Sequence, residues 1–249
     1  MQNPPAFPEL LRSMDERSTA FRSAVAAAPD LDAQVPSCPE WTLHDLAQHI
    51  GEGRRAWAAT VAAGPGAAGR SPADGVAPRD RAELDAWLAE STELLLAALR
   101  EAGPDRGCWV WWTGSQSPAT CGAVARHQLQ QLAVHTYDAQ LTIGAPQPLP
   151  SDVALDGVDE FQRTCVATTS PWPHEPAVVD YRATEGRSWR VRLSAEGARV
   201  ITGEGPADLT ATGTASELVL AFYGRVPAQA LELEGDARIF DRLAAWEPA

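Results

Sequence analysis

The stretch Arg126–Gly144, RHQLQQLAVHTYDAQLTIG, predicts one helix with a column of polar side chains on a single face. Gln131, His135 and Asp138 are separated by four and three residues, and side chains at these spacings project from the same side of a helix. A polar column that faces the interior of a domain is costly unless something pairs with it. The pattern therefore predicts a metal or a polar ligand at this face.

A second predicted helix supplies a further histidine. Thr42 and Asp45 have the spacing of a capping-box-like start, and the helix that they open runs to about Ala63. His49 lies on its inward face, whereas His44 lies off that face and is expected to be solvated. Two interpretations of His49 stay open at this point. It is a metal ligand or a core histidine that hydrogen-bonds to a neighbour.

Two more amphipathic helices are expected over residues 8–28 and 79–102, and Gly103-Pro104 ends the second of them. The connection AQVPSCPEW before Thr42 contains two prolines that exclude a regular helix, and residues 64–78 have the composition of a flexible loop. Four long helices in sequence predict a four-helix bundle, so residues 1–150 are expected to form one domain.

The pattern changes after Pro150. Residues 152–165 predict another helix, and residues 151–170 together form a connecting helix and linker. Short alternating runs then predict strands: AVVDYRA, SWRVRLS, ARVITG, ADLTATG and LELEG. Helices are expected at residues 216–223 and 237–246. Residues 151–249 therefore predict a small α+β domain, and the whole chain an α+β protein.

Composition excludes several classes of partner. The formal net charge is −13 over 249 residues, which argues against nucleic acid and against an anionic membrane surface. No apolar run is long enough to cross a bilayer, and the start of the chain does not have the pattern of a signal peptide. Four scattered cysteines without a CxxC pair indicate free thiols. We expect a cytoplasmic protein, a monomer, with a small-molecule substrate.

The chemistry that the sequence favours is metal binding. His49, Gln131 and His135 are the candidate ligands, because a catalytic metal needs few protein ligands and keeps positions open. Asp138 is a candidate to orient a ligand histidine, and His127 is a fallback ligand that is expected to be exposed. The motifs of a P-loop, a dinucleotide site, a GxSxG hydrolase and an HExxH protease are all missing from the sequence.

The loop CWVWWTGSQSP, from Cys108 to Pro118, is dense in tryptophan. Trp111 and Trp112 are candidates to line a cofactor pocket, together with Trp109. Packing at one end of the bundle is the other interpretation, and for at least two of the three tryptophans it is the favoured one.

Three segments resemble the mycothiol-dependent maleylpyruvate isomerase-like family. PSCPEWTLHDLAQHI resembles the family signature P-x-C-P-x-W-T-x-x-D-L-x-x-H. CWVWW, followed by ARHQLQQLAVHTYDA and GAPQPLP, resembles a second signature. GTASELVLAFYGRVPAQALELEGD is similar to the C-terminal domain of the family. The resemblance implies a DinB-like four-helix bundle followed by a sterol-carrier-like α+β domain.

The resemblance also implies a divalent metal, usually zinc, held by histidines at the positions of His49 and His135. A glutamate is expected one turn before the second histidine, and this chain has Gln131 there. The loss of a carboxylate weakens or retunes the site. The implied cosubstrate is the low-molecular-weight thiol mycothiol, and Arg225 matches an arginine that binds a substrate carboxylate. Arg225 and Asp138 are thus the implied catalytic residues, although a surface salt bridge is an alternative for Arg225.

Two functions follow from this resemblance. The first is a metal-dependent, mycothiol-using isomerase or S-transferase that acts on a small electrophile. The second is a non-catalytic protein that binds a thiol or another small molecule and has a degenerate metal site. Gln131 is the residue that separates the two.

Overall fold

The computed structural model describes residues 5–72 and 75–247, and it divides into two compact units. The first unit contains the chain up to Trp111 and the segment Ala119–Leu149. The second contains Trp112–Pro118 and the chain from Pro150 onward. In the part of the chain that is described, no helix is both long enough and apolar enough to span a membrane.

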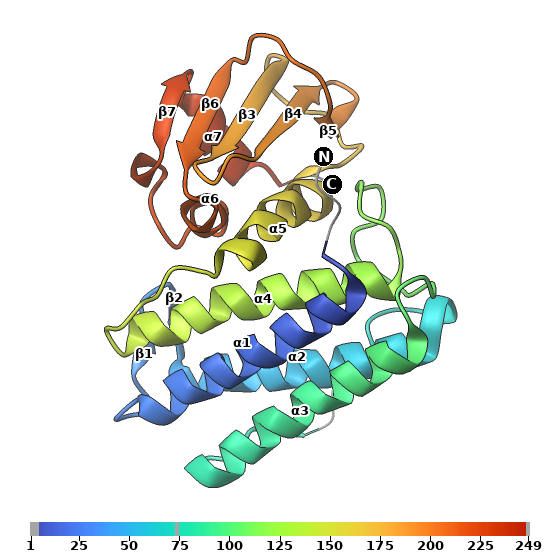
Figure 1. Cartoon of the computed structure of the whole chain (residues 1–249), viewed down its shortest axis with the longest axis vertical. Coiled ribbons are helices and arrows are strands. Elements are labelled where there is room, and N and C mark those ends of the chain that lie inside the picture. Colours follow the sequence, from blue (N-terminus) through green and yellow to red (C-terminus); the bar gives the residue numbers. More distant parts are fainter. Residues whose placement is uncertain (1–4, 73–74, 248–249) are drawn as a thin grey trace. The chain divides into compact units, whose positions relative to one another are not determined.

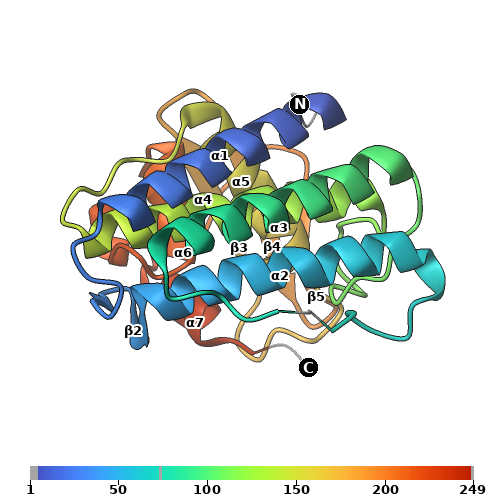
Figure 2. The same cartoon turned by 90° about the horizontal axis from the view of Figure 1, so that it is seen from below.

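The first unit is built on four long helices: α1 (Phe7–Ala27), α2 (Leu43–Ala63), α3 (Arg81–Ala102) and α4 (Cys121–Thr142). α1 packs against α3 and α4, and α2 packs against the same two helices (Figure 1). Figure 2 shows α1, α3 and α2 side by side. Leucines at helical spacing close the core, among them Leu46, Leu88 and Leu132. The predicted four-helix bundle is confirmed.

The start of α2 is held by the capping box that the sequence predicts. The Thr42 hydroxyl accepts a hydrogen bond from the Asp45 amide at 3.1 Å, and Asp45 accepts one from the Thr42 amide at 2.9 Å. A reciprocal cap of this kind satisfies two of the amides that a helix start leaves without partners. It therefore determines where α2 begins, and so which way His49 projects.

The proline-containing connection before α2 is a short hairpin and not an irregular loop. β1 (Gln34–Val35) pairs antiparallel with β2 (Cys38–Thr42). Val35 is fully buried, and the Leu43 amide donates to the Ala33 carbonyl at 2.9 Å. The hairpin is thereby fixed at the start of α2.

The second unit contains a five-stranded sheet with the order β5-β4-β3-β6-β7, visible in Figure 1. β3 and β6 are parallel, and the other neighbouring pairs are antiparallel. The strands are β3 (Ala177–Ala183), β4 (Ser188–Ser194), β5 (Gly197–Ile201), β6 (Leu209–Gly213) and β7 (Glu232–Gly235).

The helices of this unit are α5 (Ser151–Phe161), α6 (Ala215–Phe222) and α7 (Arg238–Ala245). α5 continues into one π-helical stretch, Gln162–Val166, and packs against α6. Short 3-10 turns occur at Gly64–Gly66 and Ala228–Ala230. Trp189, Val191 and Leu193 of β4 are buried as their alternation predicts. The α+β fold class is confirmed.

The expectation for His44 is wrong. This side chain is only 8% exposed, and its Nε2 lies 3.3 Å from the Pro78 carbonyl oxygen. The segment that follows α2 returns along the start of that helix, where the Ala77 amide donates to Gln48 Oε1 at 2.5 Å. A position that is off the core face of an isolated helix is therefore covered by a distant part of the chain.

Two glycines of α2 test the packing of the bundle. A Cβ at Gly51 would lie 1.9 Å from the Trp87 ring, whereas the nearest atom to a Cβ at Gly53 is the flexible end of Arg70 at 3.5 Å. We expect Gly51→Ala to lower the free energy of unfolding by about 1–3 kcal/mol through overpacking. The control Gly53→Ala should raise it by up to about 1 kcal/mol, because alanine favours helix. Urea denaturation measures both changes. Equal effects of the two substitutions would contradict the packing of α2 on α3.

Candidate functional site

Two histidines from different helices face each other in the first unit. His49 of α2 and His135 of α4 have ring centroids 5.2 Å apart, with the ring planes at 75°. Trp41 of β2 lies beside them, with its ring 4.7 Å from that of His49 and 6.3 Å from that of His135. The hairpin and α2, which are adjacent in sequence, therefore meet the distant α4 in one cluster.

His135 is oriented by a buried carboxylate on its own helix. Its Nδ1 lies 2.8 Å from Asp138 Oδ2, and the other oxygen of Asp138 accepts a hydrogen bond from the Ser37 hydroxyl at 2.6 Å. Asp138 is completely buried. A buried carboxylate is stabilised in its charged form by such donors. The role that the sequence suggested for Asp138, orienting a histidine, fits this geometry.

This contact also determines which nitrogen of His135 is free for a ligand. An ionised carboxylate only accepts hydrogen bonds, so Nδ1 of His135 is the protonated nitrogen. In the neutral tautomer of this ring, Nε2 carries the lone pair. Metal-binding histidines in proteins commonly have this arrangement, with one nitrogen donating to a carboxylate and the other binding the metal.

His49 is held in its neutral form. Burial lowers its pKa from 6.5 to about 4, and the nearby His135 contributes to the same shift. At neutral pH the His49 ring therefore offers an uncharged nitrogen. Neutral imidazole is the form that binds a metal ion.

Gln131 is the third candidate ligand, and it lies one turn before His135 on α4. Its side chain is half-buried. Within residues 5–72 and 75–247, no three His, Cys, Asp or Glu side chains are grouped as a metal site. The two imidazoles fit a metal, but position 131 contributes at most a neutral amide oxygen, which neutralises none of the charge of a divalent ion.

The fallback ligand His127 does not belong to this cluster. It is 4% exposed, so the expectation that it is solvated is wrong. Its ring packs edge-on against Trp111, at 5.5 Å and 71°. Trp111 keeps 49% of its surface exposed, but Trp112 is only 3% exposed and donates from Nε1 to the Pro118 carbonyl. The burial of Trp112 is typical of a packing role.

Arg225 belongs to the second unit, in the turn that follows α6. Its amide donates to the Leu220 carbonyl at 2.7 Å, and its Nη1 donates to the Tyr223 carbonyl at 2.7 Å. Gly224 has φ +69°, a conformation that favours glycine and that lets the chain turn back at this point. The side chain of the half-buried Arg225 is therefore fixed in part by a hydrogen bond to a backbone carbonyl two residues earlier.

Ser37 and Trp41 are members of the cluster that we did not select from the sequence. Both lie in the hairpin, whose strands are too short for an alternation pattern to reveal them. A signal was present, because both residues fall within the segment PSCPEWTLHDLAQHI that carries the family resemblance.

Comparison with family models gives two matches. Residues 11–140 match the mycothiol maleylpyruvate isomerase N-terminal domain, and residues 152–242 match the C-terminal domain of the same family. The chain belongs to the mycothiol maleylpyruvate isomerase family. The resemblance noted from the three sequence segments is thus confirmed, as is the order of the two domains.

Solved structures of the mycothiol-dependent maleylpyruvate isomerase are similar to this chain in fold. A mutant of that isomerase aligns with a TM-score of 0.59 and 12% identity, covering 94% of this chain and 96% of the other. A second structure of the isomerase aligns with a TM-score of 0.58 and 13% identity, with the same coverage. At these identities the likeness shows the fold alone. No curated protein matches the chain.

The depressed pKa of His49 predicts a pH-dependent stability in metal-free protein. The unfolded chain takes up a proton near the ordinary pKa of 6.5, but the folded chain does so only near 4. The folded state is therefore not penalised by His49 above pH 6.5, and the free energy of unfolding decreases as the pH falls from 6.5 toward 4. We expect the melting temperature of the wild type to fall by a few degrees relative to that of His49→Gln between pH 7.5 and 5. The exposed His174, replaced by Gln, is the control. Parallel curves for wild type and His49→Gln would contradict a half-buried, neutral His49.

Proposed function

We propose that this chain is a mycothiol-dependent isomerase whose reaction uses the cluster of His49, His135 and Asp138. The observation that supports the proposal best is the histidine pair, with His135 oriented by a fully buried carboxylate. A bundle core does not keep such a group for stability alone, because an apolar residue costs less there. Membership of the family supplies the substrate class, an activated double bond, and the thiol.

The residues that would hold a divalent metal are His49 and His135, with Gln131 as a weak third donor. A metal in this place would lower the pKa of a bound thiol and so increase the fraction of the reactive thiolate. The chain itself contributes two imidazoles, and it buries that of His135 away from solvent. Asp138 holds the proton of His135 on Nδ1, and Ser37 holds Asp138.

The proposed chemistry is an addition followed by an elimination. The thiol sulfur forms a bond to one carbon of the activated double bond, and the neighbouring carbon is protonated. Rotation about the resulting single bond and loss of the same thiol and proton give the isomer. The thiol is thus regenerated. Arg225 is proposed to bind a substrate carboxylate, since a guanidinium matches a carboxylate with two parallel hydrogen bonds.

An S-transferase and a non-catalytic binding protein are the alternatives, and Gln131 favours the second. A neutral amide in place of a carboxylate leaves more positive charge on the ion, so metal occupancy is lower at a given metal concentration. A chain of this fold without a metal could still bind a thiol beside Trp41 and the two histidines.

The activity is tested with mycothiol and maleylpyruvate. We expect conversion that requires the thiol and leaves its concentration unchanged, because an isomerase regenerates it. Consumption of one thiol per product would indicate an S-transferase, and thiol binding without conversion the non-catalytic protein. Arg225→Met should raise the KM for the substrate by at least about tenfold, the cost of a lost charged hydrogen bond. The exposed Arg238, replaced by Met, is the control.

Metal content tests the ligands independently of activity. We expect zinc-reconstituted wild type to retain metal after dialysis, and His49→Ala and His135→Ala to lose it. His127→Ala, on the same helix as His135 but packed on Trp111, should keep the metal. Gln131→Glu should tighten binding by about tenfold or more, since a carboxylate adds a negative charge to the site. Equal affinity in wild type and Gln131→Glu would show that residue 131 is not a ligand.

A further inference from the structure

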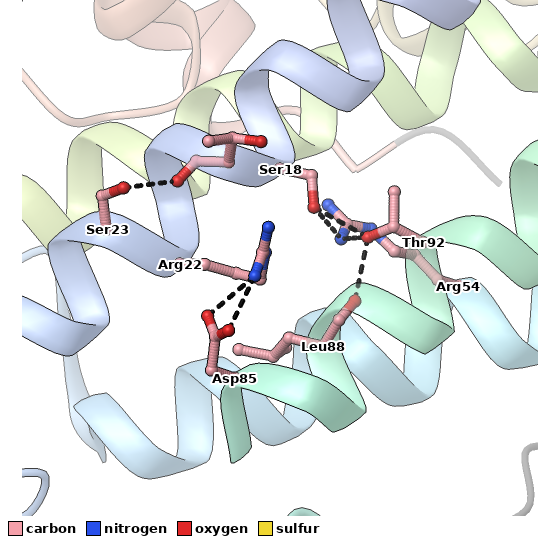
Figure 3. A network of polar contacts seen from close by, with 8 residues as sticks. Ser18, Arg22, Ser23, Arg54, Asp85, Leu88 and Thr92 are labelled. Atoms are coloured by element: carbon pink, nitrogen blue, oxygen red, sulfur yellow. Dashed lines mark hydrogen bonds and ion pairs between the residues drawn. The ribbon is translucent and has the colours of Figure 1, made fainter. Parts of the chain in front are cut away.

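A second cluster of buried polar side chains lies between α1, α2 and α3 (Figure 3). Its centre is Arg54 of α2, which is 4% exposed. Arg54 Nη1 donates to the Ser18 hydroxyl at 3.3 Å and to the Thr92 hydroxyl. The two hydroxyls are 2.8 Å apart, and Thr92 donates to the Leu88 carbonyl at 3.0 Å.

The charges in this cluster do not balance. Both partners of Arg54 are neutral hydroxyls, and the charged group that affects it most is Arg22, another cation. At the edge of the cluster the partly exposed Arg22 is paired with the partly exposed Asp85, whose two oxygens it contacts at 2.9 and 2.8 Å. Among the described residues, the cluster therefore has two guanidinium groups and one carboxylate. Burial lowers the pKa of Arg54 only to about 9, so it remains charged at neutral pH.

Two donors in the cluster also have no acceptor. Nη2 of Arg54 and Nε of Arg22 are buried, and neither has a hydrogen-bond partner within the described part of the chain. A buried charged donor without an acceptor is strongly destabilising, because it has lost its water and gained nothing in exchange. Both donors need an acceptor, and the cluster needs one negative charge.

We propose that a single small monovalent anion of the halide class, such as chloride, binds in this cluster and accepts from Arg54 Nη2 and Arg22 Nε. One negative charge balances the excess of one positive charge. A halide also accepts hydrogen bonds from several directions, so it can serve donors on two helices at once.

Both donors are enclosed by protein atoms, which favours a small occupant over phosphate, sulfate or a carboxylate ligand. A cavity of about 10 Å³ adjoins the Arg22 side of the cluster and is lined by Arg22, Asp85 and Leu88, but not by Arg54. The net charge of −13 repels anions at long range, so the attraction is local and we expect weak, millimolar binding.

The anion stabilises the helix that carries the first histidine of the candidate site. Arg54 and His49 both belong to α2, and the anion ties α2 to α1 through Arg22. The anion would stabilise the bundle whether or not the chain has the proposed enzymatic function.

The melting temperature tests the proposal when chloride replaces gluconate at constant ionic strength. We expect the melting temperature of the wild type to rise by a few degrees between about 5 and 500 mM chloride. A ligand that binds only the folded state stabilises that state by mass action. Arg54→Met should be insensitive to chloride. It should also melt above the wild type at low chloride, because an apolar side chain replaces an unbalanced charge.

The matched control is Arg55→Met, which removes the neighbouring arginine of the same helix. Arg55 pairs with Glu90 at 2.6 Å and lies outside the cluster, so this variant should keep the chloride response. Equal chloride responses in wild type and Arg54→Met would overturn the proposal.

Bromide gives a direct measurement that needs no variant. Crystals of the wild-type protein grown with bromide should show an anomalous peak within hydrogen-bond distance of Arg54 Nη2 and Arg22 Nε. A peak there supports the site even where Arg54→Met fails to fold. Electron density without anomalous signal would mean that water fills the position, and the proposal would then be wrong.

Discussion

The buried carboxylate of Asp138 is the group on which the candidate site depends. It accepts hydrogen bonds from His135 on α4 and from Ser37 in the hairpin, and it has no exposed surface. One carboxylate therefore does two things. It fixes the tautomer of a histidine, and it ties the hairpin to α4, which places Trp41 against His49. The arrangement of the site therefore follows from the two hydrogen-bond donors that the buried Asp138 requires.

The half-buried His49 and the buried Arg54 meet the cost of desolvation in different ways. His49 gives up its proton, since its pKa falls to about 4 and the neutral ring is inexpensive to bury. Arg54 cannot do this, because its pKa stays near 9. It therefore retains a charge that Ser18 and Thr92 solvate only in part. The neutral ring of His49 can bind a metal, whereas the charged Arg54 is expected to bind an anion.

The amide at position 131 sets this chain apart from what its family resemblance implies. The rings of His49 and His135 are in contact, and the residues that orient them are in place. Only the charge of the donor set has changed, from one carboxylate to none. The positions of the two histidines do not depend on the charge at residue 131, because the packing of the helices sets them.

The sequence by itself determined the long helices, the strands of the second unit and the order of the two domains, but not the hairpin before α2. Helical spacing, the cap at Thr42 and the alternation in β4 are local patterns, and local patterns can be recognised without a structure. His49 and His135 could also be selected, since each is on the inward face of a predicted helix and within a family signature. Only the tertiary structure decided the roles of Ser37 and Trp41, the burial of His44 and His127, and the unbalanced charge at Arg54. The physical reason is that burial and hydrogen bonding depend on which distant segments cover a side chain, and periodicity along one segment carries no information about that.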